Sequence, residues 1–338
     1  MNLMNINISG YINTKTSYGL VTCNIINNFI LKNYNVTLHP NGQINVADLA
    51  DLQYKHFDLL APSLRIDHQF NMSQSVGAKR FGMTFFEMDR LTDLEQHNLN
   101  SLTHLFVPSE WAKNICTQQL SGPEVTVAPL GVDMNIFNNR NYLPDKCIFL
   151  SMGKWEVRKG QDEIVKAFNK AFPSGEAELW MFFDGAKPDI VEAKKKEYAS
   201  SKIKCFNRLP TQFDVARIMN SVTCFVSHSK AEGWNLELLE AMACGRQCIS
   251  PYYSGESEFV SPDNCLLTKT DKLEWANDGM YFGLGLVNTG KWATPSEDSL
   301  IENMRKVYKN QVINTAGIQT AQHFSWKNTV NAIERHLC

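Results

Sequence analysis

The sequence predicts an α/β protein made of two doubly wound halves. Short apolar runs alternate with amphipathic helical patterns from Met4 to Ala128, and the same alternation restarts at Cys147. Between them, residues 135–146 are polar, contain Pro144 and show no periodicity, which is typical of a linker. A chain of 338 residues suffices for two ordinary domains, and strand–helix alternation favours mostly parallel sheets covered on both faces.

In the first half, the apolar pattern predicts a sheet interleaved with helices. The stripe formed by Val21, Ile25 and Phe29 predicts a helix, and Ser109 with Glu110 resembles an N-cap and an acidic first turn. We expect strands at 4–8, 35–39, 57–61, 81–86, 104–107 and 124–128, and helices at 20–31, 93–100 and from 109 onward.

The second half repeats this organisation and ends in helices. Ile164, Val165 and Phe168 mark the inward face of its first helix. We expect strands at 147–152, 178–183, 202–206, 221–227 and 247–250, and helices at 161–172, 186–200, 211–220, 236–244, 296–309, 312–323 and 325–337. The predicted domains are therefore 1–140 and 141–310, followed by closing helices at 311–338.

Composition limits the classes of function. A hydrophobic content of 43%, a charged content of 20% and a net charge of −2 are typical of a soluble globular protein and give no support for a nucleic-acid partner. The sequence contains no apolar run long enough to span a membrane, and its N-terminus does not resemble a signal peptide. We expect a cytoplasmic protein, with peripheral membrane contact as an open alternative.

The cysteines indicate a reducing compartment and no metal site. Their number, nine, is odd, and no CxxC occurs, so buried free thiols are expected. Cys244 and Cys248 flank the end of one predicted helix, but a zinc site needs two further ligands and only His228 is near in sequence. We therefore predict no bound metal.

The most informative stretch is EGWNLELLEAMACG, which runs from Glu232 to Gly245 and follows a predicted buried strand. Leu236, Leu239 and Ala243 recur at helical spacing, and Gly245 suits a helix end. The free amides and positive dipole end at the start of this helix favour an anion such as a phosphate. Ionised carboxylates on either side suit sugar hydroxyls, since they accept hydrogen bonds only. A diphosphate flanked by sugars is the expected ligand.

Three motifs, in this order along the chain, carry a resemblance to a known family. They are VPSEWAKN from Val107 with VTVAPLGVDMNIF ending at Phe137, GKWEVRKGQDEIVKAF from Gly153 to Phe168, and the Glu-x7-Glu pair in EGWNLELLEAMACG. Together they resemble the retaining glycosyltransferases of family 4, which have the GT-B fold of two Rossmann-like domains. The resemblance implies an N-terminal acceptor domain, a C-terminal nucleotide-sugar domain, and a C-terminal helix that crosses back to the N-terminal domain.

The resemblance also implies roles for residues on the donor side. Glu232 would contact the donor sugar and Glu240 the ribose, while Lys159 and Lys154 would neutralise the diphosphate. Glu232, Lys159 and Lys154 are the predicted catalytic residues. The further donor contacts would be Arg158, Asn235, Leu236, Trp234, Gly233, Arg208 and Lys230. Fixed cations and amides can replace a metal in stabilising a leaving phosphate, and no Asp-x-Asp ends a strand, so a metal-independent enzyme without a cofactor is expected.

The acceptor side matches the family pattern less closely. The loop between Gly10 and Gly19, which includes Tyr18, has the position of the family's glycine-rich loop but lacks a Gly-Gly pair. Many members carry a histidine after a middle strand, where this chain has Glu87 and Asp89, and His68 is the alternative.

The function expected is transfer of a hexose from a UDP- or GDP-sugar to a hydroxyl of a glycan, a lipid-linked sugar or a small molecule. The alternatives are a GT-B phosphorylase, a sugar-nucleotide epimerase, and a sugar-nucleotide-binding protein without catalysis.

Overall fold

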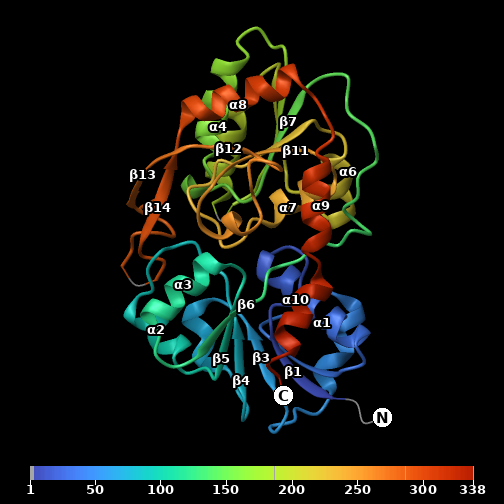
Figure 1. Cartoon of the computed structure of the whole chain (residues 1–338), viewed down its shortest axis with the longest axis vertical. Coiled ribbons are helices and arrows are strands. Elements are labelled where there is room, and N and C mark those ends of the chain that lie inside the picture. The colour runs from blue at the N-terminus through green and yellow to red at the C-terminus, as the bar shows by residue number, and fades with distance from the viewer. Residues whose placement is uncertain (1–3, 186, 286, 338) are drawn as a thin grey trace. The chain divides into compact units, whose positions relative to one another are not determined.

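The structure, a computed structural model, describes residues 4–185, 187–285 and 287–337 (Figure 1). The chain folds into two compact units. Unit 1 comprises Met1–Gly131, Gly279–Gly290 and Phe324–Cys338, and unit 2 comprises Val132–Asp278 and Lys291–His323. The polar stretch 135–146 lies inside unit 2. The chain returns to unit 1 twice: the C-terminal return was predicted, whereas the return over Gly279–Gly290 was not.

Unit 1 is built on a six-stranded parallel sheet in the order β2-β1-β3-β4-β5-β6. Helical segments separate its strands in the sequence, as alternating patterns predict. The strands are β1 (Asn5–Gly10), β2 (Asn35–Pro40), β3 (Ser63–Ile66), β4 (Arg80–Met83), β5 (His104–Val107) and β6 (Glu124–Val127). The α-helices are α1 (Ser17–Leu31), α2 (Asp93–Leu99), α3 (Glu110–Gln119) and α10 (Trp326–Glu334).

The strand predicted at 57–61 is wrong. Asp58 turns the chain there, because its Oδ1 accepts a hydrogen bond from the backbone of Leu60 at 3.0 Å. Leu59 and Leu60 are exposed at this turn, so their apolar character does not reflect burial in a sheet. The strand begins two residues after the predicted one ends, at Ser63.

Unit 2 is built on a second six-stranded parallel sheet in the order β12-β11-β10-β7-β8-β9. Its strands are β7 (Ile148–Met152), β8 (Glu178–Phe182), β9 (Ile203–Phe206), β10 (Cys224–Val226), β11 (Gln247–Pro251) and β12 (Leu266–Thr268). Its helices are α4 (Gln161–Ala171), α5 (Pro188–Tyr198), α6 (Gln212–Met219), α7 (Leu236–Ala243), α8 (Glu297–Lys309) and α9 (Thr315–His323). Ala186, the first residue of the helix predicted at 186–200, lies outside the described residues.

An antiparallel hairpin, which the sequence pattern did not indicate, completes unit 2. It pairs β13 (Thr270–Trp275) with β14 (Lys291–Pro295). Between these strands the chain visits unit 1 over Gly279–Gly290, where the backbone of Asn288 donates to Glu95 Oε1 at 3.1 Å.

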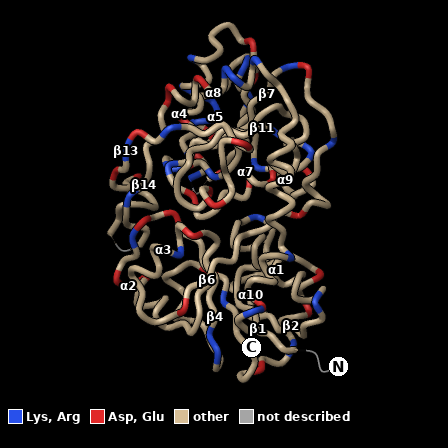
Figure 2. The backbone as a smooth tube through the Cα atoms, viewed as in Figure 1, with Lys and Arg blue, Asp and Glu red and all other residues tan. Residues whose placement is uncertain are grey.

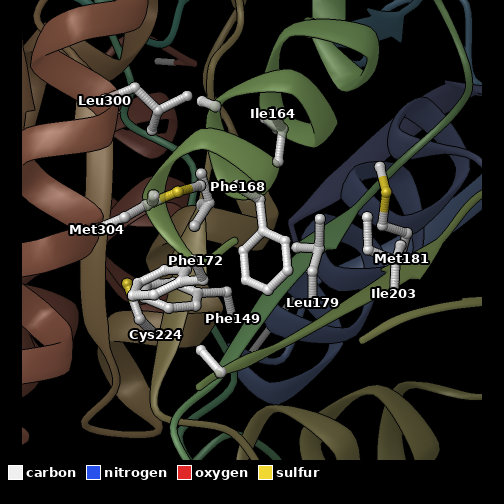
Figure 3. Close-up of a cluster of buried hydrophobic side chains, with 14 of the residues drawn as sticks. Phe149, Ile164, Phe168, Phe172, Leu179, Met181, Ile203, Cys224, Leu300 and Met304 are labelled. Carbon is white, nitrogen blue, oxygen red and sulfur yellow. The ribbon is translucent and has the colours of Figure 1, made fainter. Parts of the chain in front are cut away.

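Aromatic and aliphatic side chains form the core between the unit 2 sheet, α4 and α8 (Figure 3). Phe149 of β7 stacks on Phe172, with ring centroids 5.5 Å apart, and Phe168 crosses Phe149 edge-on at 6.1 Å. Leu300 and Met304 of α8 are also fully buried in this cluster. Each such side chain contributes about 1.5–3 kcal/mol by leaving water. The core therefore fixes β7 and its neighbour β10, whose following loops carry the predicted donor residues.

The C-terminal helix α10 packs against α1 in unit 1, as the GT-B prediction implies. Tyr34 donates a hydrogen bond to Glu334 Oε1 at 3.1 Å, and Lys32 forms an ion pair with the same carboxylate. Thr329 donates to the Pro129 carbonyl at 2.6 Å. Helix α9 stays in unit 2, so the return to unit 1 comes after His323 rather than at 311.

Charges of both signs are interspersed along both units (Figure 2). Within the described parts of the chain, no helix is long and apolar enough to cross a membrane. The eight described cysteines are all free thiols, seven of them buried, as predicted, while Cys338 lies outside the described residues.

Candidate functional site

The loop between β10 and α7 has the predicted strand–turn–helix form, and Asn235 holds it in place. Asn235 adopts a left-handed conformation with φ of 76° and caps α7, its Oδ1 accepting from the amide of Leu238 at 3.3 Å. Its Nδ2 donates to Ser227 Oγ at 3.0 Å and to Glu256 Oε2 at 2.6 Å. All hydrogen-bonding groups of this side chain are thus used to shape the loop, and the predicted donor contact at Asn235 would come from its backbone.

Glu232 is buried and bound by two cations. Its Oε1 lies 2.7 Å from Lys159 Nζ and accepts a hydrogen bond from Ser229 Oγ at 2.6 Å, and its Oε2 lies 2.9 Å from Arg158 Nη1. Burial opposes ionisation of this carboxyl, but the charges of Arg158 and Lys159 outweigh it and lower the pKa of Glu232 to about 2. Glu232 is therefore a fixed negative charge at neutral pH.

Arg158 is a structural brace rather than a free cation. Its Nη2 lies 3.1 Å from Glu156 Oε2, and its Nη1 donates to the carbonyl of Ala231 at 2.6 Å. Lys154, which is more exposed, pairs with the other oxygen of Glu156 at 3.0 Å. Of the three basic residues in this loop, Lys159 is the one paired directly with Glu232 and not with Glu156. Lys159 also lies in the field of Glu237, in the first turn of α7.

Two loops from neighbouring parallel strands meet at this cluster. The basic loop follows β7 and ends in the short 3-10 turn Val157–Lys159, and β7 pairs with β10. Gly160 closes the turn with φ of 68°, and a Cβ there would lie 2.5 Å from the His228 carbonyl oxygen. The amide of Lys230 donates to the Arg158 carbonyl at 2.7 Å. The cluster therefore forms at the carboxyl ends of the strands, where open α/β sheets bind ligands.

Glu240 differs from the ionised acceptor that the sequence suggested. It is buried on α7, and burial, followed by the negative charge of Glu237, raises its pKa well above the usual range. The neutral carboxyl can donate one hydrogen bond as well as accept. A ribose diol, which offers both donors and acceptors, still suits it.

The remaining predicted donor residues divide into two groups. Gly233, Trp234 and Leu236 are buried in the loop and the first turn of α7. The two cations face acidic partners instead: Lys230 Nζ lies 3.1 Å from Glu274 Oε1 on the hairpin, and Arg208 lies 3.6 Å from Asp184 at an exposed position. Lys230 also stacks over the Trp292 ring at 5.4 Å.

Three residues around Glu232 were not predicted from the sequence. Ser254 Oγ accepts from the Glu232 amide at 2.7 Å, Ser229 donates to the Glu232 carboxylate, and Glu256 accepts from Asn235. Burial, together with the negative charge of Glu232, raises the pKa of Glu256 to about 8. The only sequence signal for Glu256 is its place in the polar stretch SGESE, which resembles many exposed turns.

Replacing Glu256 by Gln should flatten the pH dependence of stability. Between the ordinary carboxyl value of about 4.5 and about 8, folded Glu256 holds a proton that the unfolded chain releases, so wild-type stability falls as pH rises through this window. Gln cannot ionise, so E256Q should gain stability over wild type with rising pH, at no more than about 1.4 kcal/mol per unit. Denaturant midpoints across this range measure the effect.

The matched control is the exposed Glu176, whose change to Gln should leave the pH profile parallel to that of wild type. A parallel profile for E256Q as well would show that Glu256 is ionised in the folded protein.

On the predicted acceptor side, unit 1 brings Tyr18 and His68 together. Their ring centroids lie 4.3 Å apart, and the Tyr18 hydroxyl donates to the Phe85 carbonyl at 2.8 Å. Burial raises the Tyr18 pKa, and the charge of Glu87 adds to the shift, so Glu87 lies near this hydroxyl.

The other predicted acceptor residues, Gly10, Gly19 and Asp89, have close neighbours within unit 1. A Cβ at Gly10 would lie 2.9 Å from Thr22 Oγ1, and one at Gly19 would lie 2.4 Å from the Asn13 carbonyl. Gly10 thus lets β1 lie close to α1, and Gly19 lets the first turn of α1 lie close to the preceding loop at Asn13. Helix α1 begins at Ser17 rather than at the predicted Leu20. Asp89 lies beside the segment Gly279–Gly290, and its Oδ1 would be 2.8 Å from a Cβ built on Gly290.

A family model matches the part of the chain that contains this cluster. Residues 146–278, which include the basic loop, Glu232 and Glu240, match the family described as glycosyl transferases group 1. The predicted resemblance is confirmed at the level of group 1 glycosyl transferases, and the predicted enzyme class, a glycosyltransferase, is confirmed with it. No curated protein sequence matches the chain.

Solved structures confirm the predicted GT-B fold over nearly the whole chain. Sucrose-phosphate synthase from Thermosynechococcus elongatus is similar with a TM-score of 0.74 and 12% identity, covering 98% of both chains. A glycosyltransferase from Rickettsia africae has a TM-score of 0.74 and 13% identity, covering 99% of this chain and 98% of its own. Anabaena HepE, solved with UDP and glucose, has a TM-score of 0.70 and 13% identity, covering 99% of both chains.

Proposed function

We propose that the chain is a retaining, metal-independent glycosyltransferase of family 4 that moves a hexose from a nucleotide-diphosphate sugar to a hydroxyl acceptor. The observation that carries this proposal is the buried Lys159–Glu232–Arg158 cluster at the carboxyl edge of the unit 2 sheet. It lies in the stretch that matches group 1 glycosyl transferases.

The cluster supplies what donor cleavage requires. Breaking the sugar–phosphate bond leaves negative charge on the diphosphate, and fixed positive groups aimed at that charge lower the barrier. Lys159 is held in place by Glu232, and the first amides of α7 add the positive end of the helix dipole. Arg158, braced by Glu156 and Ala231, fixes Glu232 and acts on the donor through it. No cofactor is needed for this chemistry.

Glu232 and Glu240 divide the remaining donor contacts. Glu232 still has lone pairs that can accept from sugar hydroxyls, because a carboxylate offers about four acceptor positions. Glu240, neutral and buried, pairs with the ribose hydroxyls. HepE was solved with UDP and glucose, which makes UDP-sugars the first donors to test and GDP-sugars the second. The acceptor would be a glycan, a lipid-linked sugar or a small molecule, and free buried thiols support a cytoplasmic location.

Replacing Glu240 by Ala should raise the KM for donor by about tenfold with a smaller change in kcat. The lost contact with the ribose is made in the ground state and the transition state alike. Steady-state kinetics with varied donor measure this effect, and Glu176→Ala, at an exposed position of unit 2, is the control. An unchanged KM in a folded Glu240→Ala protein would remove Glu240 from the donor site.

Product analysis separates the proposal from its alternatives. Incubation of the protein with sugar nucleotides alone would reveal an epimer, and incubation with inorganic phosphate would reveal a sugar phosphate. Donor binding without transfer across a panel of acceptors would indicate a non-catalytic binding protein. Formation of a glycoside with the donor's anomeric configuration supports the proposed function.

A further inference from the structure

Unit 1 contains a second group of polar side chains, and none of its members is a residue of the predicted site. Among the described residues, His104, Glu124 and His336 are the group of metal-binding side chains whose ligand atoms all lie within 4.8 Å of one another. His104 and Glu124 are the first residues of β5 and β6 and face each other in the register of these strands. His336 follows α10, more than two hundred residues later in the chain.

The distances are those of a ligand set that needs little adjustment. His104 Nδ1 lies 3.6 Å from Glu124 Oε2, and the two imidazole centroids are 4.4 Å apart. In a tetrahedral site with bonds of about 2.0–2.1 Å, neighbouring ligand atoms lie about 3.3 Å apart. A metal between these three groups would therefore require shifts of well under the length of one bond.

The surroundings of His104 resemble the support that metal-binding histidines have. Its Nε2 lies 3.0 Å from Thr126 Oγ1, so the ring nitrogen that faces away from Glu124 has its own hydrogen-bond partner. Such a partner fixes the tautomer and the orientation of the ring. His104 is buried, whereas the Glu124 side chain is 71% exposed, so an ion can enter from solvent and keep water as a further ligand.

We propose that His104, Glu124 and His336 bind one divalent transition-metal ion of the Zn²⁺ type, and that this ion fixes the segment after α10 to the unit 1 sheet. Two imidazoles and one carboxylate suit Zn²⁺ better than Ca²⁺ or Mg²⁺, which prefer oxygen ligands. The site lies where β5 and β6 begin, whereas ligands of open α/β sheets bind where strands end. Its role is therefore structural, and it is compatible with sugar transfer that uses no metal.

Metal titration of the full-length, tag-free protein after removal of metals by chelation tests this site. We expect equilibrium dialysis with elemental analysis to give one Zn²⁺ per chain. With Co²⁺ in its place, we expect visible absorption bands typical of an ion with few ligands. Glu124→Gln and His336→Gln should each weaken binding by about tenfold or more. Zn²⁺ should also slow hydrogen exchange in residues 326–337 of the wild type and have no such effect in His336→Gln.

The controls are His97→Gln and Glu110→Gln, which change exposed residues of the same unit and should bind Zn²⁺ like the wild type. His336 is only half-buried and lies in a turn after α10, so its variant should fold, as circular dichroism can verify. Failure of folded wild-type protein to bind Zn²⁺ would overturn the proposal. Equal binding by wild type and the Glu124→Gln/His336→Gln double variant would also overturn it, because the ion would then lie on other groups.

Discussion

Replacing Glu232 by Ala is expected to destabilise unit 2 by about 3–5 kcal/mol and to abolish donor turnover. The large effect on stability arises because Lys159 and Arg158 would stay buried without the carboxylate that they share. Arg158 keeps Glu156 as a partner, so most of the penalty falls on Lys159. Denaturant titration followed by the fluorescence of the unit 2 tryptophans measures the shift in midpoint.

A double variant distinguishes loss of an ion pair from loss of packing. Glu232→Gln with Lys159→Met removes both charges and keeps their volume, so it should recover much of the stability that Glu232→Ala loses. Glu237→Gln, in the adjacent first turn of α7 but only partly buried, is the control and should have a small effect. If Glu232→Ala unfolded at the same denaturant concentration as the wild type, the buried cluster would not exist in solution.

Replacing Lys159 by Met should lower kcat by about a hundredfold to a thousandfold, with a smaller effect on the KM for donor. Its ammonium is expected to interact most strongly with the diphosphate once the sugar–phosphate bond breaks, and removal of one such group from a preorganised site costs this much. Single-turnover release of the nucleotide diphosphate measures the cleavage step directly.

Two further variants assign the effect to position and charge. Lys170→Met removes an exposed lysine that pairs with Glu297 on the surface of the same unit, and it should leave kcat unchanged. Lys159→Arg keeps the charge but alters its geometry, so an intermediate rate is expected. Wild-type turnover by Lys159→Met would show that another cation stabilises the leaving phosphate.

Local patterns sufficed for ten of the twelve strands of the two parallel sheets, because each of these strands carries its own apolar run, whereas β3 and β12 were not predicted. They failed where the environment comes from distant residues. The hairpin strands β13 and β14 have no such run, and each finds its partner across the excursion over Gly279–Gly290. At 57–61 the apolar residues are real, but the Asp58 turn leaves Leu59 and Leu60 exposed.

In the predicted donor site, too, some features could be predicted from the sequence and others depend on distant residues. The resemblance to family 4 predicted Lys159, Arg158 and Glu232 in one site, and in the structure their loops follow β7 and β10, which pair with each other. That Arg158 is braced by Glu156, and that Glu256 is buried and protonated, depends on packing that no local pattern encodes. His104, Glu124 and His336 come from β5, β6 and the segment after α10, so only the folded chain brings them together.

The three-segment construction of unit 1 reverses the order in which the two units can be completed on the ribosome. All of unit 2 has been synthesised once His323 has emerged, whereas unit 1 still lacks α10. Until then the nascent chain would expose the face of α1 that α10 covers, along with the Pro129 carbonyl that binds Thr329. The unit in which the chain begins is therefore the unit whose last segment is synthesised last.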